Sequence, residues 1–119
     1  MEDNDEPTER VYRVDQFVVP EAARDEFLSR VRQTHALLRA QPGFVQDFVL
    51  EQSWGQGSFN FVTIVEWANE AVVEQARAAV TKMQARANFN PQESFARLGI
   101  KPDLGYYRRV DAWERCRRA

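Results

Sequence analysis

Apolar side chains occupy both alternating faces of the segment 59–67, and this pattern restricts the possible folds more than any other feature of the chain. The apolar residues of the segment are Phe59, Phe61, Val62, Ile64, Val65 and Trp67. Successive side chains of a strand point to opposite faces of its sheet, so a strand of this kind needs cover on both sides. We therefore expect a sheet with both faces shielded from water.

Three further strands and two helices are predicted around this segment. Periodicity and turn residues place strands at 11–19, 44–52 and 106–110 and helices at 21–41 and 70–87, with one or two more helical turns compatible with 91–98. The first helix carries an apolar stripe of Ala23, Phe27, Val31, Thr34 and Leu38. Asn69 is a favourable N-cap for the second helix. Gly55 and Gly57 permit the tight reversal of a hairpin between the second and third strands.

The predicted order of elements is β-α-β-β-α-β, which indicates a ferredoxin-like α+β sandwich. Two helices cover only one face of a four-stranded sheet, so the other apolar face of 59–67 would stay exposed in a monomer. Pairing of two sheets removes that exposure, and we expect a homodimer. The domain is placed at 10–110, between a flexible acidic N-terminal tail (1–9) and a basic C-terminal tail (111–119).

Composition narrows the classes of partner and the cellular setting. The net charge of -2 argues against a dedicated nucleic-acid binder. The sequence has neither an apolar run of about 18 residues nor a basic and apolar leader, so we expect no membrane span and no secretory signal. Cys116 is the only cysteine, which excludes an internal disulfide and a cysteine metal cluster and favours a cytoplasmic location.

Three short motifs lie at the boundaries of the predicted elements. Val19-Pro20 leads into the first helix, Gln41-Pro42-Gly43-Phe44 leads out of it, and Val65-Glu66-Trp67-Ala68-Asn69-Glu70 leads into the second. In this order they resemble the antibiotic biosynthesis monooxygenase (ABM) family over about residues 11–110. The resemblance implies a dimeric α/β barrel with a pocket between sheet and helices in each protomer. Some members oxidise quinol-like aromatics with molecular oxygen and no cofactor, and others bind and degrade haem.

The resemblance also assigns positions to a site. Haem-degrading members use an asparagine on the first strand, a tryptophan and a histidine on the second helix, and these positions are Asp15, Trp67 and Ala76 here. Alanine cannot ligate iron, so haem degradation ranks third among the functions and no cofactor is expected. Quinol-oxidising members use an asparagine four residues before the tryptophan. Thr63 stands there and can donate a hydrogen bond, although it is not the same group.

Asp15, Trp67 and His35 are the candidate catalytic residues. A buried Asp15 would have a raised pKa and could act as a base toward a phenol, whereas a solvated or interface carboxylate would have no such role. Trp67 would either wall a pocket or pack in the core. His35, one position off the apolar stripe, is either a polar residue on the helix flank or an acid–base group in a pocket.

Two functions from different classes follow. The first is a cofactor-independent monooxygenase acting on a small aromatic or quinol-like substrate, which needs a dry pocket and a base. The alternative is a non-catalytic ligand-binding or interaction dimer of the same fold. A cavity of aromatic size with Asp15 or His35 pointing into it favours the enzyme, and a closed interior favours the alternative.

Overall fold

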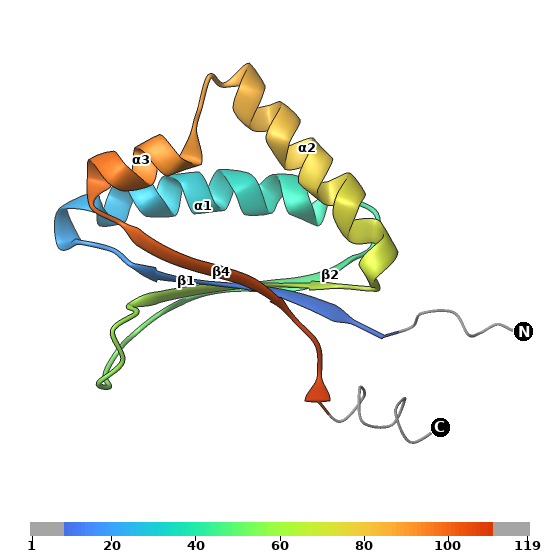
Figure 1. Ribbon diagram of the computed structural model, residues 1–119, viewed down its shortest axis with the longest axis horizontal. Helices are drawn as coiled ribbons and strands as arrows, with labels where there is room; N and C mark the ends of the chain where they lie inside the picture. Colours follow the sequence, from blue (N-terminus) through green and yellow to red (C-terminus); the bar gives the residue numbers. More distant parts are fainter. Residues whose placement is uncertain (1–8, 111–119) are drawn as a thin grey trace, which may run out of the picture.

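The computed structural model describes residues 9–110 and contains a four-stranded antiparallel sheet with all three of its helices on one side (Figure 1). The elements are β1 (Val11–Val18), α1 (Arg24–Arg39), β2 (Phe44–Glu51), β3 (Phe61–Trp67), α2 (Val73–Arg86), α3 (Pro91–Leu98) and β4 (Lys101–Tyr107). Strand order is β2-β3-β1-β4. The ferredoxin-like α+β class is therefore confirmed, and the doubly apolar segment is a central strand.

Most of the predicted elements form, and two details were predicted wrongly. The last strand begins at Lys101 and not at 106, because Pro102 lies in an edge strand, where a missing N–H is tolerated. Asn69 does not cap the second helix with its side chain, and its Oδ1 is buried without a hydrogen-bond partner. The predicted tails at 1–9 and 111–119, Cys116 included, lie outside the described residues except for Glu9.

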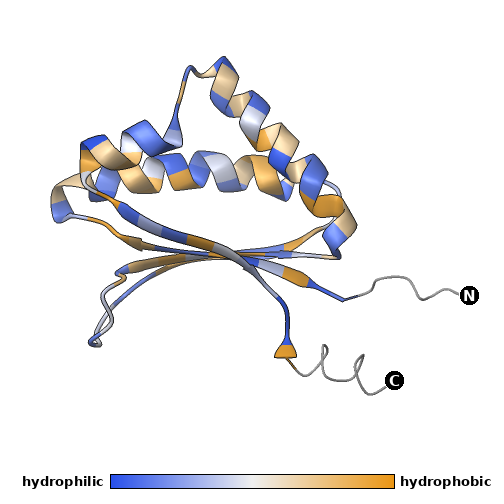
Figure 2. Ribbon diagram, viewed as in Figure 1, coloured by the Kyte–Doolittle hydropathy of each residue, from blue (hydrophilic) through white to orange (hydrophobic). Residues whose placement is uncertain are grey.

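Apolar residues on the helix-facing side of the sheet form two separate clusters. The large cluster consists of Phe17, Val19, Ala23, Phe27, Phe61 and Ile100, and the small cluster consists of Val11, Val65, Trp67 and Ala76. In the large cluster the ring of Phe27 from α1 lies 4.9 Å from that of Phe17 and 5.1 Å from that of Phe61, centroid to centroid. Figure 2 shows hydrophobic and hydrophilic residues mixed along the elements, as expected when each has one side toward a core.

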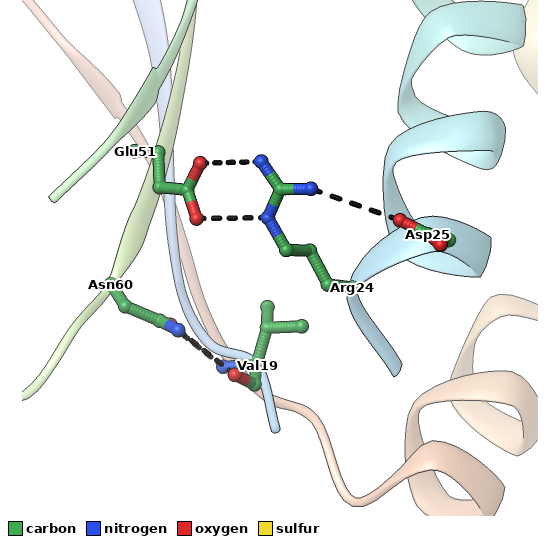
Figure 3. A network of polar contacts seen from close by, with 5 residues as sticks. All are labelled: Val19, Arg24, Asp25, Glu51 and Asn60. Carbon is green, nitrogen blue, oxygen red and sulfur yellow. Dashed lines mark hydrogen bonds and ion pairs between the residues drawn. The ribbon is translucent and has the colours of Figure 1, made fainter. Parts of the chain in front are cut away.

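Polar contacts hold the start of α1 and the end of β1 against the β2–β3 hairpin (Figure 3). Arg24 of α1 donates two hydrogen bonds to the Glu51 carboxylate of β2, at 2.9 and 2.7 Å. The Asn60 side-chain amide donates to the carbonyl of Val19 at 2.8 Å and accepts from its N–H at 2.8 Å. This paired contact extends the β1–β3 pairing beyond the last residue of β1.

The side of the sheet opposite the helices, here called the open face, carries exposed apolar residues. Phe48 and Leu50 of β2 are 46% and 48% exposed, and their register partners Ile64 and Val62 of β3 are half-buried. Glu66, at the end of this face, is 8% exposed. Its carboxylate accepts hydrogen bonds at 2.9, 3.3 and 2.7 Å from the side chains of Arg10, Tyr12 and Gln46.

None of the described helices is long and apolar enough to cross a membrane.

Gly43, in the turn between α1 and β2, lies directly against Val72, and a substitution there tests how tightly this turn is packed. Its φ is +87°, and a Cβ there would lie 2.7 Å from the Cβ of Val72. Gly43→Ala should therefore lower the free energy of unfolding by about 2–4 kcal/mol, from left-handed strain and overpacking together. Chemical denaturation measures this. Gly57→Ala is the control, since its nearest neighbour would be 3.6 Å away, and it should change stability by less than ~0.5 kcal/mol.

Candidate active site

Between the two apolar clusters, the helix-facing side of the sheet carries polar residues in two adjacent rows. The strand register places Arg13 between Val65 and Tyr106, and Asp15 beside Thr63. Asp47 of β2 lies on the far side of Val65 in the same row as Arg13. α1 contributes His35 to this region from above. Together these residues form what we call the polar layer: Arg13, Asp15, His35, Asp47, Thr63 and Tyr106.

Asp15 lies inside the fold and not on the open face. Its side chain is 17% exposed, and Arg13 Nε donates to its Oδ1. Arg13 in turn donates from Nη1 to the hydroxyl of Tyr106 at 3.0 Å, with its guanidinium 4.9 Å from the tyrosine ring centroid. Burial raises the pKa of the Asp15 carboxyl above its usual value, although the hydrogen bonds from Arg13 and from the Gly105 backbone act in the opposite direction. This is the interior position that a catalytic base requires.

His35 is 5% exposed, so the helix-flank interpretation of this residue is wrong. It continues a row of four-residue steps through Phe27 and Val31, and α1 turns that row toward the sheet. Its Nδ1 lies 2.8 Å from Oδ2 of Asp47.

Asp47 therefore joins β2 to α1. Its Oδ2 also accepts a hydrogen bond from Arg39 Nε at 3.1 Å. Burial alone would raise the pKa of the Asp47 carboxyl, but the hydrogen bonds from His35 and Arg39 outweigh burial and lower it. Asp47 is accordingly ionised at neutral pH and able to orient the imidazole.

Trp67 packs in the core, and Thr63 is buried beside Asp15. Trp67 is 3% exposed and meets the ring of Phe44 edge-on, with the centroids 6.0 Å apart. Thr63 is 5% exposed. The structure thus places Trp67 at the end of the polar layer and not within it.

A cavity of about 480 Å³ opens beside the polar layer, which is within the usual range for small-molecule sites. Its lining residues are Val11, Glu70, Val73, Glu74, Arg77, Tyr106, Tyr107 and Arg108. Tyr106 is common to the cavity and the polar layer, and Trp67 lies directly behind the wall through Val11 and Val73. Asp15 and His35 do not line the cavity themselves. Leu104, the register partner of Asp15 on β4, is 49% exposed.

A second cavity, of about 380 Å³, lies between α1 and β2. It is lined by Leu28, Val31, Arg32, Arg39, Asp47, Val49, Glu51 and Phe61. Asp47 therefore reaches His35 on its inner side and borders this cavity on its outer side. Within residues 9–110, no group of three histidine, cysteine or acidic side chains is arranged to hold a metal ion.

Arg13, Asp47 and Tyr106 are the members of the polar layer that sequence reasoning missed. Two signals for them were present in the chain. Arg13 and Asp15 are two residues apart on one strand, so they share a face. The four-residue row from Phe27 through Val31 ends at His35, which predicts a buried histidine in need of a polar partner.

Comparisons with known proteins show which family and which solved structures the chain resembles. The family model described as antibiotic biosynthesis monooxygenase matches residues 10–86. A putative monooxygenase from Shewanella loihica PV-4 is similar with a TM-score of 0.65 and 17% identity, covering 86% of this chain and 95% of that one. SnoaB, a cofactor-independent oxygenase from Streptomyces nogalater, is similar with a TM-score of 0.57 and 25% identity, covering 83% and 91%.

A haem-degrading protein from Mycobacterium tuberculosis is also similar, with a TM-score of 0.53 and 18% identity, covering 87% of this chain and 93% of that one. No curated protein matches the sequence. At 17% and 18% identity, the likeness to the Shewanella and Mycobacterium structures shows the fold alone.

The buried position of Trp67 leads to a stability prediction. Trp67→Phe removes part of a ring from the small cluster and should lower the free energy of unfolding by about 1–2 kcal/mol. Trp54→Phe is the matched control, because Trp54 is 88% exposed in the β2–β3 turn and should change stability by less than ~0.5 kcal/mol. Equal effects of the two substitutions in thermal or urea unfolding would contradict the core position of Trp67.

Proposed function

Because the chain belongs to the antibiotic biosynthesis monooxygenase family, we propose that it is a cofactor-independent monooxygenase acting on a small aromatic or quinol-like substrate. The observation that carries this proposal is a carboxylate held inside the fold, Asp15, which is joined through Arg13 to Tyr106 in the wall of a cavity of suitable size. The likeness to SnoaB, whose description is that of a cofactor-independent oxygenase, supports it.

The proposed reaction begins with a proton transfer. Asp15 accepts the proton of a phenolic hydroxyl, so that the O–H bond breaks and the ring becomes an electron-rich anion. Arg13 is then available to balance the negative charge that moves from the carboxylate to the substrate. The anion reduces molecular oxygen: a ring carbon forms a C–O bond, its C–H bond breaks as the O–O bond breaks, and that carbon becomes the new carbonyl of a quinone. The other oxygen atom leaves as water and takes up the proton from that C–H bond. Asp15 returns its proton to the departing oxygen.

Trp67 and Tyr106 have supporting roles in this proposal. Tyr106 forms part of the cavity wall and hydrogen-bonds Arg13. Trp67 holds the same wall from behind, through Val11 and Val73. Both therefore shape the wall of the cavity.

Haem does not fit the residues present. Ala76, at the position of the iron-binding histidine, is 2% exposed and packed with Trp67 in the small cluster. The only histidine, His35, lies under α1 with its Nδ1 at Asp47. We therefore propose no haem chemistry for this chain.

One observation favours the non-catalytic alternative. Asp15 is not among the residues that line the 480 Å³ cavity, so a ligand could bind there without contacting the base. The alternative predicts ligand-induced thermal stabilisation without oxygen uptake. The proposed enzyme shows both when a panel of phenols, hydroquinones and naphthols is tested.

The pH dependence of turnover tests the role of Asp15. A base works only when ionised, so a raised pKa moves the acidic limb of the kcat profile to a pH above the ordinary aspartate value of about 3.9. Asp15→Asn should lower kcat by about 10²–10⁴-fold and abolish that limb. Oxygen consumption against pH is the measurement. Asp103→Asn, a carboxylate on the opposite face in β4, is the control. An unchanged profile in Asp15→Asn removes Asp15 from the site.

We also propose that two copies pair through their open faces. Phe48 and Leu50 are about half exposed, and each lies beside a half-buried apolar residue of β3. A contiguous apolar surface of this kind is typical of a protein–protein interface. Glu66 is already neutralised by Arg10, so the charged end of the face does not oppose pairing.

Light scattering on two neighbouring variants tests the pairing. Phe48→Glu puts a charge on the open face and should convert a dimer to a monomer at micromolar concentration. Val49→Glu is the matched control, because Val49 is the next residue of the same strand, is 39% exposed and faces the helices. It should remain dimeric. A monomeric wild-type protein, or equal dissociation of both variants, would contradict the proposal.

A further inference from the structure

The second cavity, of about 380 Å³, shares no lining residue with the larger one and lies between α1 and the edge strand β2. Its strand wall is formed by alternate residues of β2, which point to the same face of the sheet: Asp47, Val49 and Glu51. Phe61 of β3, the register partner of Glu51, completes the lining on this side. The helix wall consists of Leu28, Val31, Arg32 and Arg39. We call this space the α1–β2 groove.

Two ion pairs join α1 to β2, one at each end of the groove. At one end, Arg24 donates two hydrogen bonds to the carboxylate of Glu51, at 2.9 and 2.7 Å (Figure 3). At the other end, Arg39 Nε donates to Oδ2 of Asp47 at 3.1 Å. Because Asp47 and Glu51 lie on either side of Val49 along the strand, the two ion pairs enclose an apolar stretch between them.

The middle of the groove is apolar and incompletely covered. Val49 faces the helices and yet is 39% exposed, so α1 does not cover this part of the edge strand. Leu28 and Val31 on the helix wall are half-buried, and the buried ring of Phe61 lies beneath them. An apolar molecule placed here would remove these side chains from water, and the gain in free energy would grow with the apolar area covered.

One positive charge of the groove is left without a counter-charge. Each carboxylate of the strand wall has an arginine of its own, Arg24 for Glu51 and Arg39 for Asp47. Arg32 lies midway along α1 between these two arginines and is exposed at the rim. Within residues 9–110, the Arg32 guanidinium takes part in no ion pair and no hydrogen bond. Its planar fork of N–H donors matches a carboxylate, which it can bind through two parallel hydrogen bonds.

We propose that the α1–β2 groove binds a carboxylate with an apolar body, which lies on Val31, Val49 and Phe61 while its carboxylate group accepts hydrogen bonds from Arg32. A single negative charge fits better than a phosphate, because Asp47 and Glu51 would repel additional charge. The groove stays accessible when two copies pair through their open faces, since it lies on the other side of the sheet. The inference does not depend on the proposed oxidation.

Binding of octanoate tests the proposal at neutral pH, below its micelle concentration. Octanoate has no phenol on which the proposed oxidation could act, so binding is measured apart from turnover. In protein labelled at leucine and valine methyl groups, NMR should show saturable shifts at Leu28, Val31 and Val49. Val11 and Val73 line the larger cavity and should stay unshifted. 1-Octanol, which lacks the charge, should bind about ten-fold more weakly.

Two variants of the groove and one control locate the charge that binds. Arg32→Gln should weaken octanoate binding about ten-fold without disturbing the fold, because the side chain is exposed. Val49→Glu should abolish binding, since the introduced carboxylate occupies the apolar wall and pairs with Arg32. Arg30→Gln is the matched control, with the same change in net charge on the same helix. Arg30 lies over the ring of Phe89, outside both cavities, and octanoate should bind this variant as it binds wild type.

Four results would each overturn the inference. They are the absence of saturable shifts, shifts confined to Val11 and Val73, equal affinities for octanoate and 1-octanol, and equal affinities of Arg32→Gln and Arg30→Gln for octanoate. Oxygen uptake with phenols tests the proposed oxidation separately, so either proposal can fail while the other stands.

Discussion

Burial of the helix-facing side of β3 is the interaction on which the rest of the structure depends. Phe61 at one end of the strand and Trp67 at the other are almost fully buried, each in its own apolar cluster. The clusters close the space between sheet and helices at both ends. The middle of that space can therefore hold polar groups at low water content, where hydrogen bonds and charges interact more strongly than in solvent.

The polar layer is tolerated in this position because its charges are paired. Arg13 balances Asp15, and Asp47 has both His35 and Arg39 as donors. An uncompensated charge at the same depth would cost several kcal/mol. The pairing also leaves each carboxylate in a different state: burial raises the pKa of Asp15, whereas two donors lower that of Asp47. When the environments of two carboxyl groups shift their pKa values in opposite directions, one site provides two groups with different proton affinities.

Local patterns predicted the element order but not the site. The β2–β3 hairpin and both long helices follow from alternation, helical periodicity and turn residues, which depend on neighbours in sequence. The partners within the polar layer are distant in the chain, as with Arg13 and Tyr106, and only the strand register brings them together. His35 was misplaced because three- and four-residue steps fit the first helix almost equally well, and Thr34 completed the stripe as readily.

The two apolar clusters share no residue, and they are unequal in size. The large one joins β1, β3 and α1 through phenylalanine rings that meet edge-on or tilted, whereas the small one is covered by Ala76 and Val73 of α2, by Val72 just before α2 and by Leu38 of α1. Free energies of local opening follow the apolar contacts that must separate, so α2 can loosen while the aromatic end stays closed. Val73 also lines the larger cavity. The two ends of the domain are thus held by unequal amounts of buried apolar surface, and the larger cavity adjoins the end with less of it.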